Sequence, residues 1–212
     1  MKNLRNTYLF ILFIFFTACE PQVTFDEPQP DDTDNLKKFP SKLQGEYESL
    51  KDNSILLISD QTILRTINFD FKAHIDSLDN NLKISGDTVF DIESDEKTLI
   101  IRTGDTISFN FRYVDTLFQI NHDNVVRKLK GFYFINHKYD QDRWEVKKIQ
   151  LAKGQLTISS ISSEAEIENL QMITESPQDT VSPYHITTTK KQFKKFVRNE
   201  GFQNTETFVR RK

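Results

Sequence analysis

The sequence predicts a mainly β protein, with α+β character at its C-terminal end. We expect an antiparallel meander that forms an open barrel or sandwich and carries two short helices. Three observations predict this class. Residues 106–113 alternate strictly between apolar and polar side chains, short strand-like segments are separated by tight turns, and two capped helical patterns occur after residue 160.

The clearest predicted strand covers residues 106–114, and its alternation is strict over residues 106–113. Its odd-numbered side chains are apolar and its even-numbered side chains are polar. The first set is Ile107, Phe109, Phe111 and Tyr113; the second is Thr106, Ser108, Asn110 and Arg112. Because successive side chains of a strand point to opposite faces, this pattern predicts one buried face and one solvent face.

Short loops connect most of the other expected strands. Gly86-Asp87 and Gly104-Asp105 form two-residue hairpin loops in which glycine supplies a positive φ, Lys153-Gly154 closes a third hairpin, and residues 51–53 form a longer loop. Residues 72–81 fit either a short helix or an irregular crossover. The other expected strands are 45–50, 54–59, 62–71, 82–85, 88–92, 97–103, 116–121, 131–136, 144–152, 155–161 and 206–210.

Two helices are expected near the C-terminus. Ser163 and Glu166 have the spacing of a capping box and precede an apolar stripe that includes Ile167. Thr189 can cap a second helix over residues 190–199, and Gly201 is the expected left-handed stop.

The chain divides into three expected regions: a signal over 1–18, an acidic tether over 19–38 and a β-rich domain over 39–212. The domain contains the pattern LxGxY twice, at residues 43–47 and 129–133. This echo indicates either two related modules, 39–128 and 129–212, or a chance repetition.

The first 19 residues carry the most specific signal in the sequence. Lys2 and Arg5 precede an apolar run over residues 8–16. A bilayer-spanning helix needs about 20 residues, so this run has the proportions of an export signal. It ends in Phe16-Thr17-Ala18-Cys19, which resembles a bacterial lipoprotein signal, although Phe16 stands where leucine is usual.

That resemblance implies diacylglycerol on the Cys19 sulfur, cleavage before Cys19, and acylation of the new amino terminus with a fatty acid such as palmitate. The alternative is an ordinary signal peptide that ends in a chance cysteine. Cys19 is the only cysteine, so the chain has no internal disulfide.

The segment over 19–38 is rich in proline and carboxylates, which predicts an extended, solvated spacer. It resembles the acidic export signals of surface-exposed Bacteroidetes lipoproteins, which implies an outer-membrane lipoprotein of the cell envelope, on its surface or periplasmic face. The net charge is −3, and loss of Lys2 and Arg5 with the signal leaves −5. Nucleic acid is therefore not an expected partner.

The LxGxY pattern resembles the first strand of lipocalin-type barrels, in which glycine lets an aromatic side chain close the barrel. This resemblance implies a carrier of a small apolar ligand. The candidate lining residues are Tyr47, Phe109, Phe111, Tyr133 and Trp144. The mature chain also resembles Bacteroidetes lipoproteins that have no common assigned activity.

Motifs for catalysis or metal binding are missing from the sequence. It has no HExxH pair, no GxSxG turn and no glycine-rich phosphate loop, so we expect no cofactor, metal or catalytic residue. The first functional hypothesis is a non-enzymatic, lipid-anchored binding or scaffolding module; the second is the lipocalin-like carrier, and the third is a hydrolase whose carboxylates the sequence does not single out.

The basic residues of 187–212 are either a solvated helix face or a docking surface for an acidic partner. Several Asp-Ser/Thr-apolar triplets resemble Bacteroidetes O-glycosylation sites, and Ser77 and Thr180 lie in the least regular of them. An aspartate that closes a turn before a strand produces the same triplet.

Overall fold

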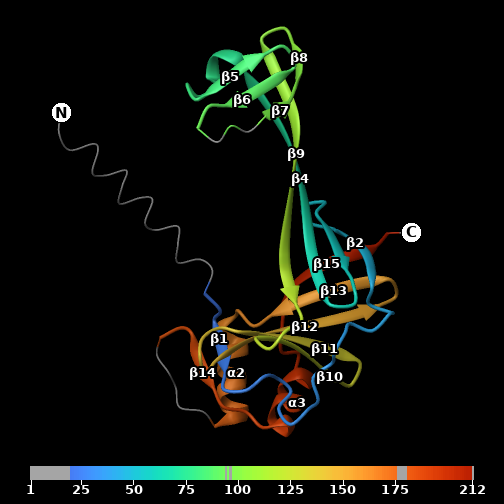
Figure 1. Cartoon of the computed structure of the whole chain (residues 1–212). Helices are drawn as coiled ribbons and strands as arrows, with labels where there is room; N and C mark the ends of the chain where they lie inside the picture. Colours follow the sequence, from blue (N-terminus) through green and yellow to red (C-terminus); the bar gives the residue numbers. More distant parts are fainter. Residues whose placement is uncertain (1–19, 94, 96, 176–180, 212) are drawn as a thin grey trace, which may run out of the picture.

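The computed structural model describes residues 20–93, 95, 97–175 and 181–211 (Figure 1). It shows a body, a long two-stranded arm and a small head at the far end of the arm (Figure 1). The expected signal over 1–18, Cys19 and Thr180 lie outside the described residues. Within the described part, no helix has both the length and the apolar character needed to cross a bilayer.

The mainly β prediction is confirmed, and the principal sheet is open. Its order is β10-β11-β12-β13-β15-β2-β3-β4-β9-β8, and adjacent strands in this path are antiparallel. The strands are β2 Gly45–Ser49, β3 Ile55–Ile58, β4 Thr62–His74, β8 Ile101–Thr103, β9 Thr106–Gln119, β10 Asn124–Leu129, β11 Phe132–Lys138, β12 Trp144–Ala152, β13 Gln155–Ser160 and β15 Asn204–Arg210.

The predicted two-residue loops are confirmed. Gly86 and Gly104 have φ values of 62° and 60°, and Lys153 and Gly154 both have positive φ. Residues 130 and 131 make a fourth loop of this kind, which leads from β10 into β11. The expected strand over 97–103 is two strands, because Ile100 is buried between β7 (Lys97–Leu99) in the head and β8 in the principal sheet.

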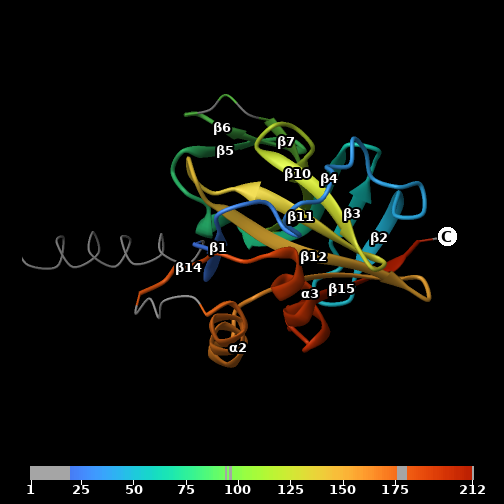
Figure 2. The same cartoon turned by 90° about the horizontal axis from the view of Figure 1, so that it is seen from below.

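β11 and β12 are buried on both faces and separate two apolar cores. Tyr133 and Ile135 point into the first core, on the concave side of the sheet, whereas Phe134 points into the second. The second core lies under helices α2 (Glu164–Thr174) and α3 (Lys190–Arg198), which lie together against this face (Figure 2). Both expected helices are confirmed, with the predicted capping box at Ser163 and Glu166 and the predicted cap at Thr189, which forms a capping box with Gln192.

The left-handed stop predicted at Gly201 is wrong by one residue. Glu200 has the positive φ, 61°, whereas Gly201 does not. A Cβ atom on Gly201 would lie 2.5 Å from the Phe196 ring, so glycine is required there for close packing. Gly201 therefore lets the chain pass directly over the buried side of α3.

The prediction of a solvated tether is wrong for residues 23–30. Residues Val23–Phe25 form β1, which is fully buried, pairs in parallel with β14 (Tyr184–Ile186) and meets β12 at Trp144. Pro28, Gln29 and Pro30 are buried too. The composition misled because the apolar residues Val23 and Phe25, although few, fill the gap beside Phe193 in the second core.

Two polar side chains hold this N-terminal segment on the sheet. The fully buried Asn136 amide donates to the Gln29 carbonyl at 3.0 Å and accepts a hydrogen bond from the Gln29 backbone N–H. Arg127 donates to the carbonyls of Pro28 and Pro30 and, at 2.8 Å, to Asn35 Oδ1. Burial lowers the pKa of the Arg127 guanidinium, although nearby carboxylates led by Asp31 oppose that effect.

The prediction that one face of residues 106–114 is buried is wrong for most of this strand. β4 and β9 leave the body as a two-stranded ribbon, and Phe111 and Tyr113 are half exposed instead of buried. A bulge at Leu117 of β9 lies opposite Ile63 and Leu64, where β4 is still paired with β3 in the body. Only the end at Ile107 is buried, in the small core of the head.

The head consists of a three-stranded sheet and a single 3₁₀ turn, η2 (Ile75–Ser77). Its strands are β5 (Leu82–Ser85), β6 (Thr88–Asp91) and β7. Val89, Ile100 and Ile107 form its core. The ambiguous segment over residues 72–81 is thus the end of β4, one 3₁₀ turn and a loop.

We predict that Asn136→Ala lowers the free energy of unfolding by about 1–3 kcal/mol, because the Gln29 backbone groups lose their partner in a buried site. Chemical denaturation measures the loss, and limited proteolysis should show new cleavage within residues 22–36. Asn121→Ala is the control, because Asn121 is exposed. Equal stability of the two variants would contradict the role of the Asn136–Gln29 hydrogen bonds in holding the N-terminal segment.

Candidate functional site

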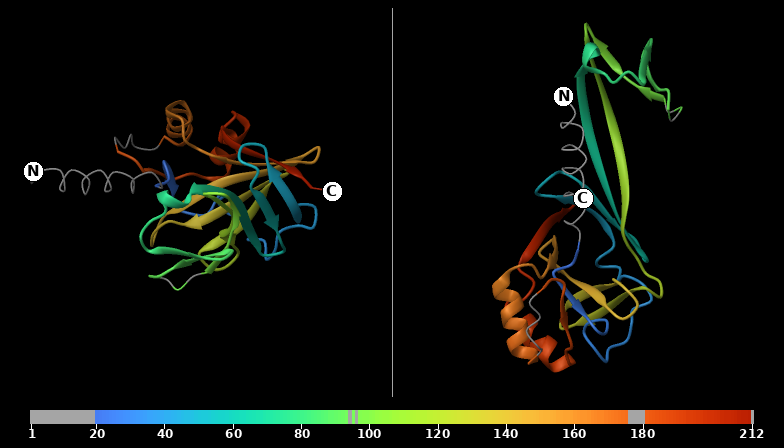
Figure 3. Two further views of the ribbon diagram at one scale, coloured as in Figure 1. Left: turned by 90° about the horizontal axis from the view of Figure 1, so that it is seen from above. Right: turned by 90° about the vertical axis from the view of Figure 1, so that its left-hand side faces the viewer.

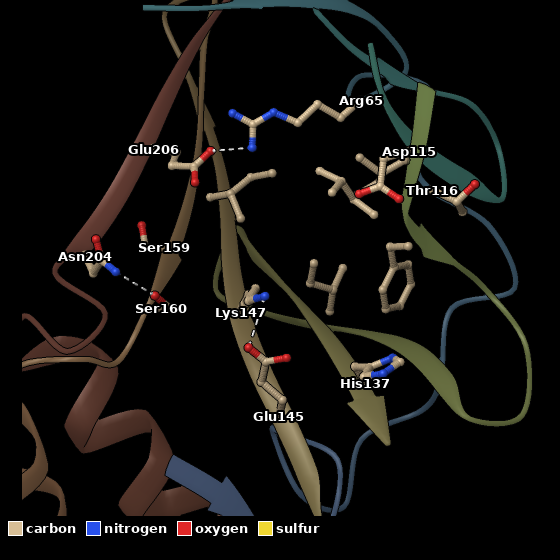
Figure 4. Close-up of a pocket in the computed structure, with 15 residues that line it drawn as sticks. Arg65, Asp115, Thr116, His137, Glu145, Lys147, Ser159, Ser160, Asn204 and Glu206 are labelled. Atoms are coloured by element: carbon tan, nitrogen blue, oxygen red, sulfur yellow. Dashed lines mark hydrogen bonds and ion pairs between the residues drawn. The ribbon is translucent and has the colours of Figure 1, made fainter. Parts of the chain in front are cut away.

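Among the described residues, the head has a depression of about 670 Å³, and the body has a cleft of about 490 Å³ on the concave side of the sheet (Figure 4). Its walls come from β4, β9, β11, β12, β13 and β15, so strands that are far apart in the sheet order face one another across it. Its apolar lining consists of Ile63, Leu117, Phe118, Ile135 and Ile158. Most of these side chains also belong to or pack against the first core, so the cleft is the unfilled end of that core.

Charged side chains line the rest of the cleft. Arg65 on β4 makes ion pairs with Asp52 at 2.8 Å and with Glu206 on β15 at 3.3 Å. Lys147 and Glu145, both on β12, make a second pair at 3.0 Å. Figure 4 shows the Arg65–Glu206 pair at one end of the cleft and the Lys147–Glu145 pair nearer to His137. These contacts fix the cationic groups before any ligand arrives.

Asp52 anchors the Arg65 side chain from outside the cleft. Burial alone would raise the pKa of the Asp52 carboxyl, but hydrogen bonds from Ser54 and Ser49 and the Arg65 charge together hold it well below the usual 3.8. Ser54 Oγ donates to the carboxylate at 2.7 Å. Asp52 therefore stays ionised at neutral pH and keeps the guanidinium at the cleft.

Asp115 differs from the other carboxylates of the cleft. It lies on β9 opposite Arg65 on β4, yet among the described residues it makes no salt bridge within 4 Å. His137 lies at the opposite end, where its Nδ1 bonds to Asn124 Oδ1. Arg65 and Lys147 give two formal positive charges, against three negative charges from Asp115, Glu145 and Glu206. The cleft thus has one carboxylate available for a cationic ligand group.

The five aromatic residues predicted to line a ligand cavity do not lie together, and none of them lines this cleft. Tyr47 and Tyr133 are fully buried in the first core, and Trp144 is half-buried at the start of β12. Phe109 lines a smaller cavity of about 280 Å³ in the head. Phe111 is exposed on the arm.

The LxGxY motif at residues 43–47 nevertheless closes one end of the core. Tyr47 donates to the Leu43 carbonyl at 2.8 Å, and the Arg210 guanidinium lies 4.9 Å from the centre of its ring. Burial is the main cause that raises the pKa of the Tyr47 hydroxyl, against the opposing charge of Arg210. Gly45 leaves room for Arg210, since a Cβ atom there would lie 3.1 Å from its Nη1.

Of the two glycosylation candidates, Ser77 is exposed in η2 at the head, and Thr180 lies outside the described residues. The basic C-terminal residues Lys190, Lys191 and Lys195 are exposed on α3. Desolvation and the nearby charges of Arg198 and Lys194 lower the pKa of Lys130. Positive charges of α3 and of the β10–β11 loop therefore lie close together.

Within the residues that the structure describes, no group of three or more His, Cys, Asp or Glu side chains could hold a metal ion. The chain matches no protein-family model, no curated protein and no solved structure in the comparisons with known proteins. The functional argument therefore rests on the geometry of the molecule itself.

Sequence reasoning missed the cleft because the curvature of the sheet creates it. Arg65, Asp115 and Glu206 come from three strands that are far apart in the sequence. None of them forms part of a local motif. Opposite charges on predicted strands are the available signal, and they do not indicate which strands face each other.

We predict that Asp52 stabilises the fold only while it is ionised. Its folded-state pKa is depressed, so its contribution is complete above about pH 4, the ordinary carboxyl pKa, and is lost as the pH falls further. Urea unfolding of wild type and Asp52→Asn should therefore differ at about pH 6 and converge as the pH falls below about 4. Asp79→Asn, in the exposed head, controls for loss of a surface charge. A difference independent of pH would contradict the prediction.

Proposed function

We propose that the chain is a non-enzymatic, lipid-anchored binding protein of the outer membrane, attached through acylated Cys19. It faces the cell surface or the periplasm. Its cleft binds a small amphiphile. The observation that carries the proposal is the cleft, since a cavity of about 490 Å³ with an apolar lining and a few polar groups is of the size and character of small-molecule sites.

The short distance between Cys19 and the folded body supports a ligand drawn from the membrane. β1 begins at Val23, so its Cα atom lies within about 14 Å of that of Cys19. Glu20 lines a depression of about 210 Å³ that shares Glu145, Lys147, Ser160 and Asn204 with the cleft. A ligand could pass from the bilayer surface into the cleft over a short path.

The side chains of the cleft indicate the chemical class of the ligand. Ile63, Phe118 and Ile158 offer an apolar surface, and Asp115 offers a carboxylate without a partner among the described residues. Arg65 and Lys147 are already paired. An amphiphile with a cationic or zwitterionic head group satisfies Asp115 and leaves the existing ion pairs intact.

The lipocalin-like carrier of a small apolar ligand is the second candidate. The volume of the cleft favours it. The charged rim opposes a purely apolar ligand, because binding would leave Asp115 desolvated without compensation. The exposed lysines of α3 support an acidic partner at the C-terminal segment, in addition to the cleft ligand.

We expect Cys19→Ser to release the protein from the membrane fraction and to abolish acyl mass at its amino end. A single acyl chain holds a protein only marginally, at about 0.8 kcal/mol per buried methylene, and two or three chains attach it stably. Fractionation followed by intact-mass measurement tests this. A Cys19→Ser protein that remained with the membranes would overturn the anchor.

For the cleft, we expect wild type to bind octyltrimethylammonium, below the concentration at which it forms micelles, more tightly than octyl sulfate. Asp115→Asn should weaken binding of the cation about threefold to fivefold, as expected for a partly exposed ion pair. Ile158→Trp should abolish binding of both compounds by filling the cleft. Isothermal titration calorimetry measures all three effects.

Ile101→Trp is the matched control, because it adds the same bulk at an exposed site in the arm and head region. Binding to Ile158→Trp with wild-type affinity would contradict the proposed site. Equal affinity of the wild-type protein for the cationic and the anionic compound would contradict the role assigned to Asp115, but it would not contradict the cleft as the binding site.

A further inference from the structure

The arm has one exposed aromatic face. In the β4–β9 pairing Ile67 lies opposite Tyr113, Phe69 opposite Phe111 and Phe71 opposite Phe109. Phe69, Phe71, Phe111 and Tyr113 are 51%, 42%, 50% and 48% exposed. The head packs only against the far end of this face, near Phe71 and Phe109. Contiguous exposed apolar surface of this kind marks interaction sites in soluble proteins.

The opposite face of the arm is polar. Asn68, Asp70 and Lys72 of β4 alternate with the aromatic residues, and Asp70 accepts a hydrogen bond from Asn110 of β9 at 2.9 Å. The arm is therefore an amphipathic layer of two strands. A two-stranded ribbon is only marginally stable in water without further strands or a covering layer.

The outer edge of β4 is free along the arm. β3 pairs with β4 only as far as Thr66, so within the described residues 67–74 have a partner strand on the β9 side alone. The right-hand view of Figure 3 shows the arm as two strands that stand clear of the body. A long free edge of this kind readily pairs with a further strand.

The direction of the backbone groups follows from two hydrogen bonds. The Ser59 N–H donates to the Thr62 carbonyl at 2.9 Å, so the backbone N–H and C=O groups of Thr62 point to the β3 side of β4. At the far end, the Ile75 N–H donates to the Asp105 carbonyl at 2.8 Å, on the β9 side. Because these directions alternate along a strand, Asn68, Asp70 and Lys72 direct their N–H and C=O groups to the free edge.

We propose that a second copy of the chain pairs with this edge, β4 against β4, antiparallel about a two-fold axis at Phe71. Each Asp70 then lies opposite Lys72 of the other copy, in a hydrogen-bonded pair, and the two contacts are identical by symmetry. Opposite charges in directly facing positions stabilise a sheet. The aromatic faces of both arms merge into one face of a four-stranded sheet.

Charge complementarity selects this register among those that keep the aromatic faces together. An axis at Asp70 or at Lys72 brings two identical charges face to face, and like charges directly opposite are destabilising. An axis at Phe69 leaves both residues opposite uncharged side chains. A shift by one residue would turn the aromatic face of one copy against the polar face of the other.

A disulfide trap tests the register in the full chain with Cys19→Ser, which leaves an introduced thiol as the only one. At the axis the two copies of residue 71 form a non-hydrogen-bonded pair with Cα atoms about 4.5 Å apart, within the range of a disulfide. We expect Phe71→Cys to oxidise in air to a covalent dimer, seen as doubled mass on a non-reducing gel.

Phe111→Cys is the matched control. It replaces the same residue type on the same face at similar exposure, but it lies on β9. In the proposed dimer the β9 strands are the outer ones, so the two thiols are more than about 14 Å apart and stay reduced. A monomeric Phe71→Cys protein, or equal cross-linking of both variants through stacked faces, would overturn the proposal.

A charge exchange provides a second, independent readout in the Phe71→Cys background. Asp70→Lys and Lys72→Asp should each weaken dimer formation about tenfold, because each places two pairs of like charges across the axis. The double exchange Asp70→Lys with Lys72→Asp should restore it. Circular dichroism should show all three variants folded, since both side chains are exposed. Failure of the double exchange to restore the dimer would exclude this register.

Discussion

The structure depends on the burial of β11 and β12 on both faces. Tyr133 and Ile135 fill the concave core on one side, and Phe134 packs against Phe193 and Phe202 on the other. A strand buried on both sides needs a covering layer on each. The curved sheet supplies one layer, and the two helices with β1 supply the second. Asn136 is the polar residue on the second side. Its Nδ2 also donates to the Phe134 carbonyl at 3.1 Å, and its Oδ1 accepts from the backbone N–H of Gln29, which the N-terminal segment brings to it.

This constraint explains why the fold has three regions of different character. Near β11 and β12, the sheet has an apolar core on each face. Farther along β4 and β9, none of the described residues covers the middle of the ribbon, and Phe69, Phe111 and Tyr113 are exposed there. The cleft lies between these regions, where the first core ends and the sheet still curves around it. The site and the exposed arm therefore have the same origin, the end of the covering layers.

Local features of the fold could be predicted because local residues determine them. Ser163 with Glu166, Thr189 with Gln192, and glycine at residues 86 and 104 act within a few positions of the chain. The period-two pattern also identified residues 106–113 as a strand, although β9 continues without a break to Gln119, through part of the separate strand expected over 116–121. It could not show that one end of β9 lies in a core and the middle lies outside it. Alternation reports which side chains share a face, and burial depends on what covers that face.

The candidate site and the packing of the N-terminal segment could not be predicted from sequence patterns, because both depend on contacts between residues far apart in the chain. Arg65, Asp115 and Glu206 meet only after the sheet curves. Residues 23–30 are proline-rich and acidic in composition, yet they join the second core through two apolar side chains, Val23 and Phe25. Pairing across more than a hundred residues, as between Gln29 and Asn136, leaves no local trace.

Hydrogen exchange of the backbone amides tests the central claim most directly, since it reports whether residues 23–30 belong to the folded body. We expect the amides of Val23, Phe25 and Gln29 to exchange as slowly as those of β11, because both open only when the second core opens. Exchange of residues 23–30 as fast as that of the exposed Gln22, with β11 still protected, would contradict this account.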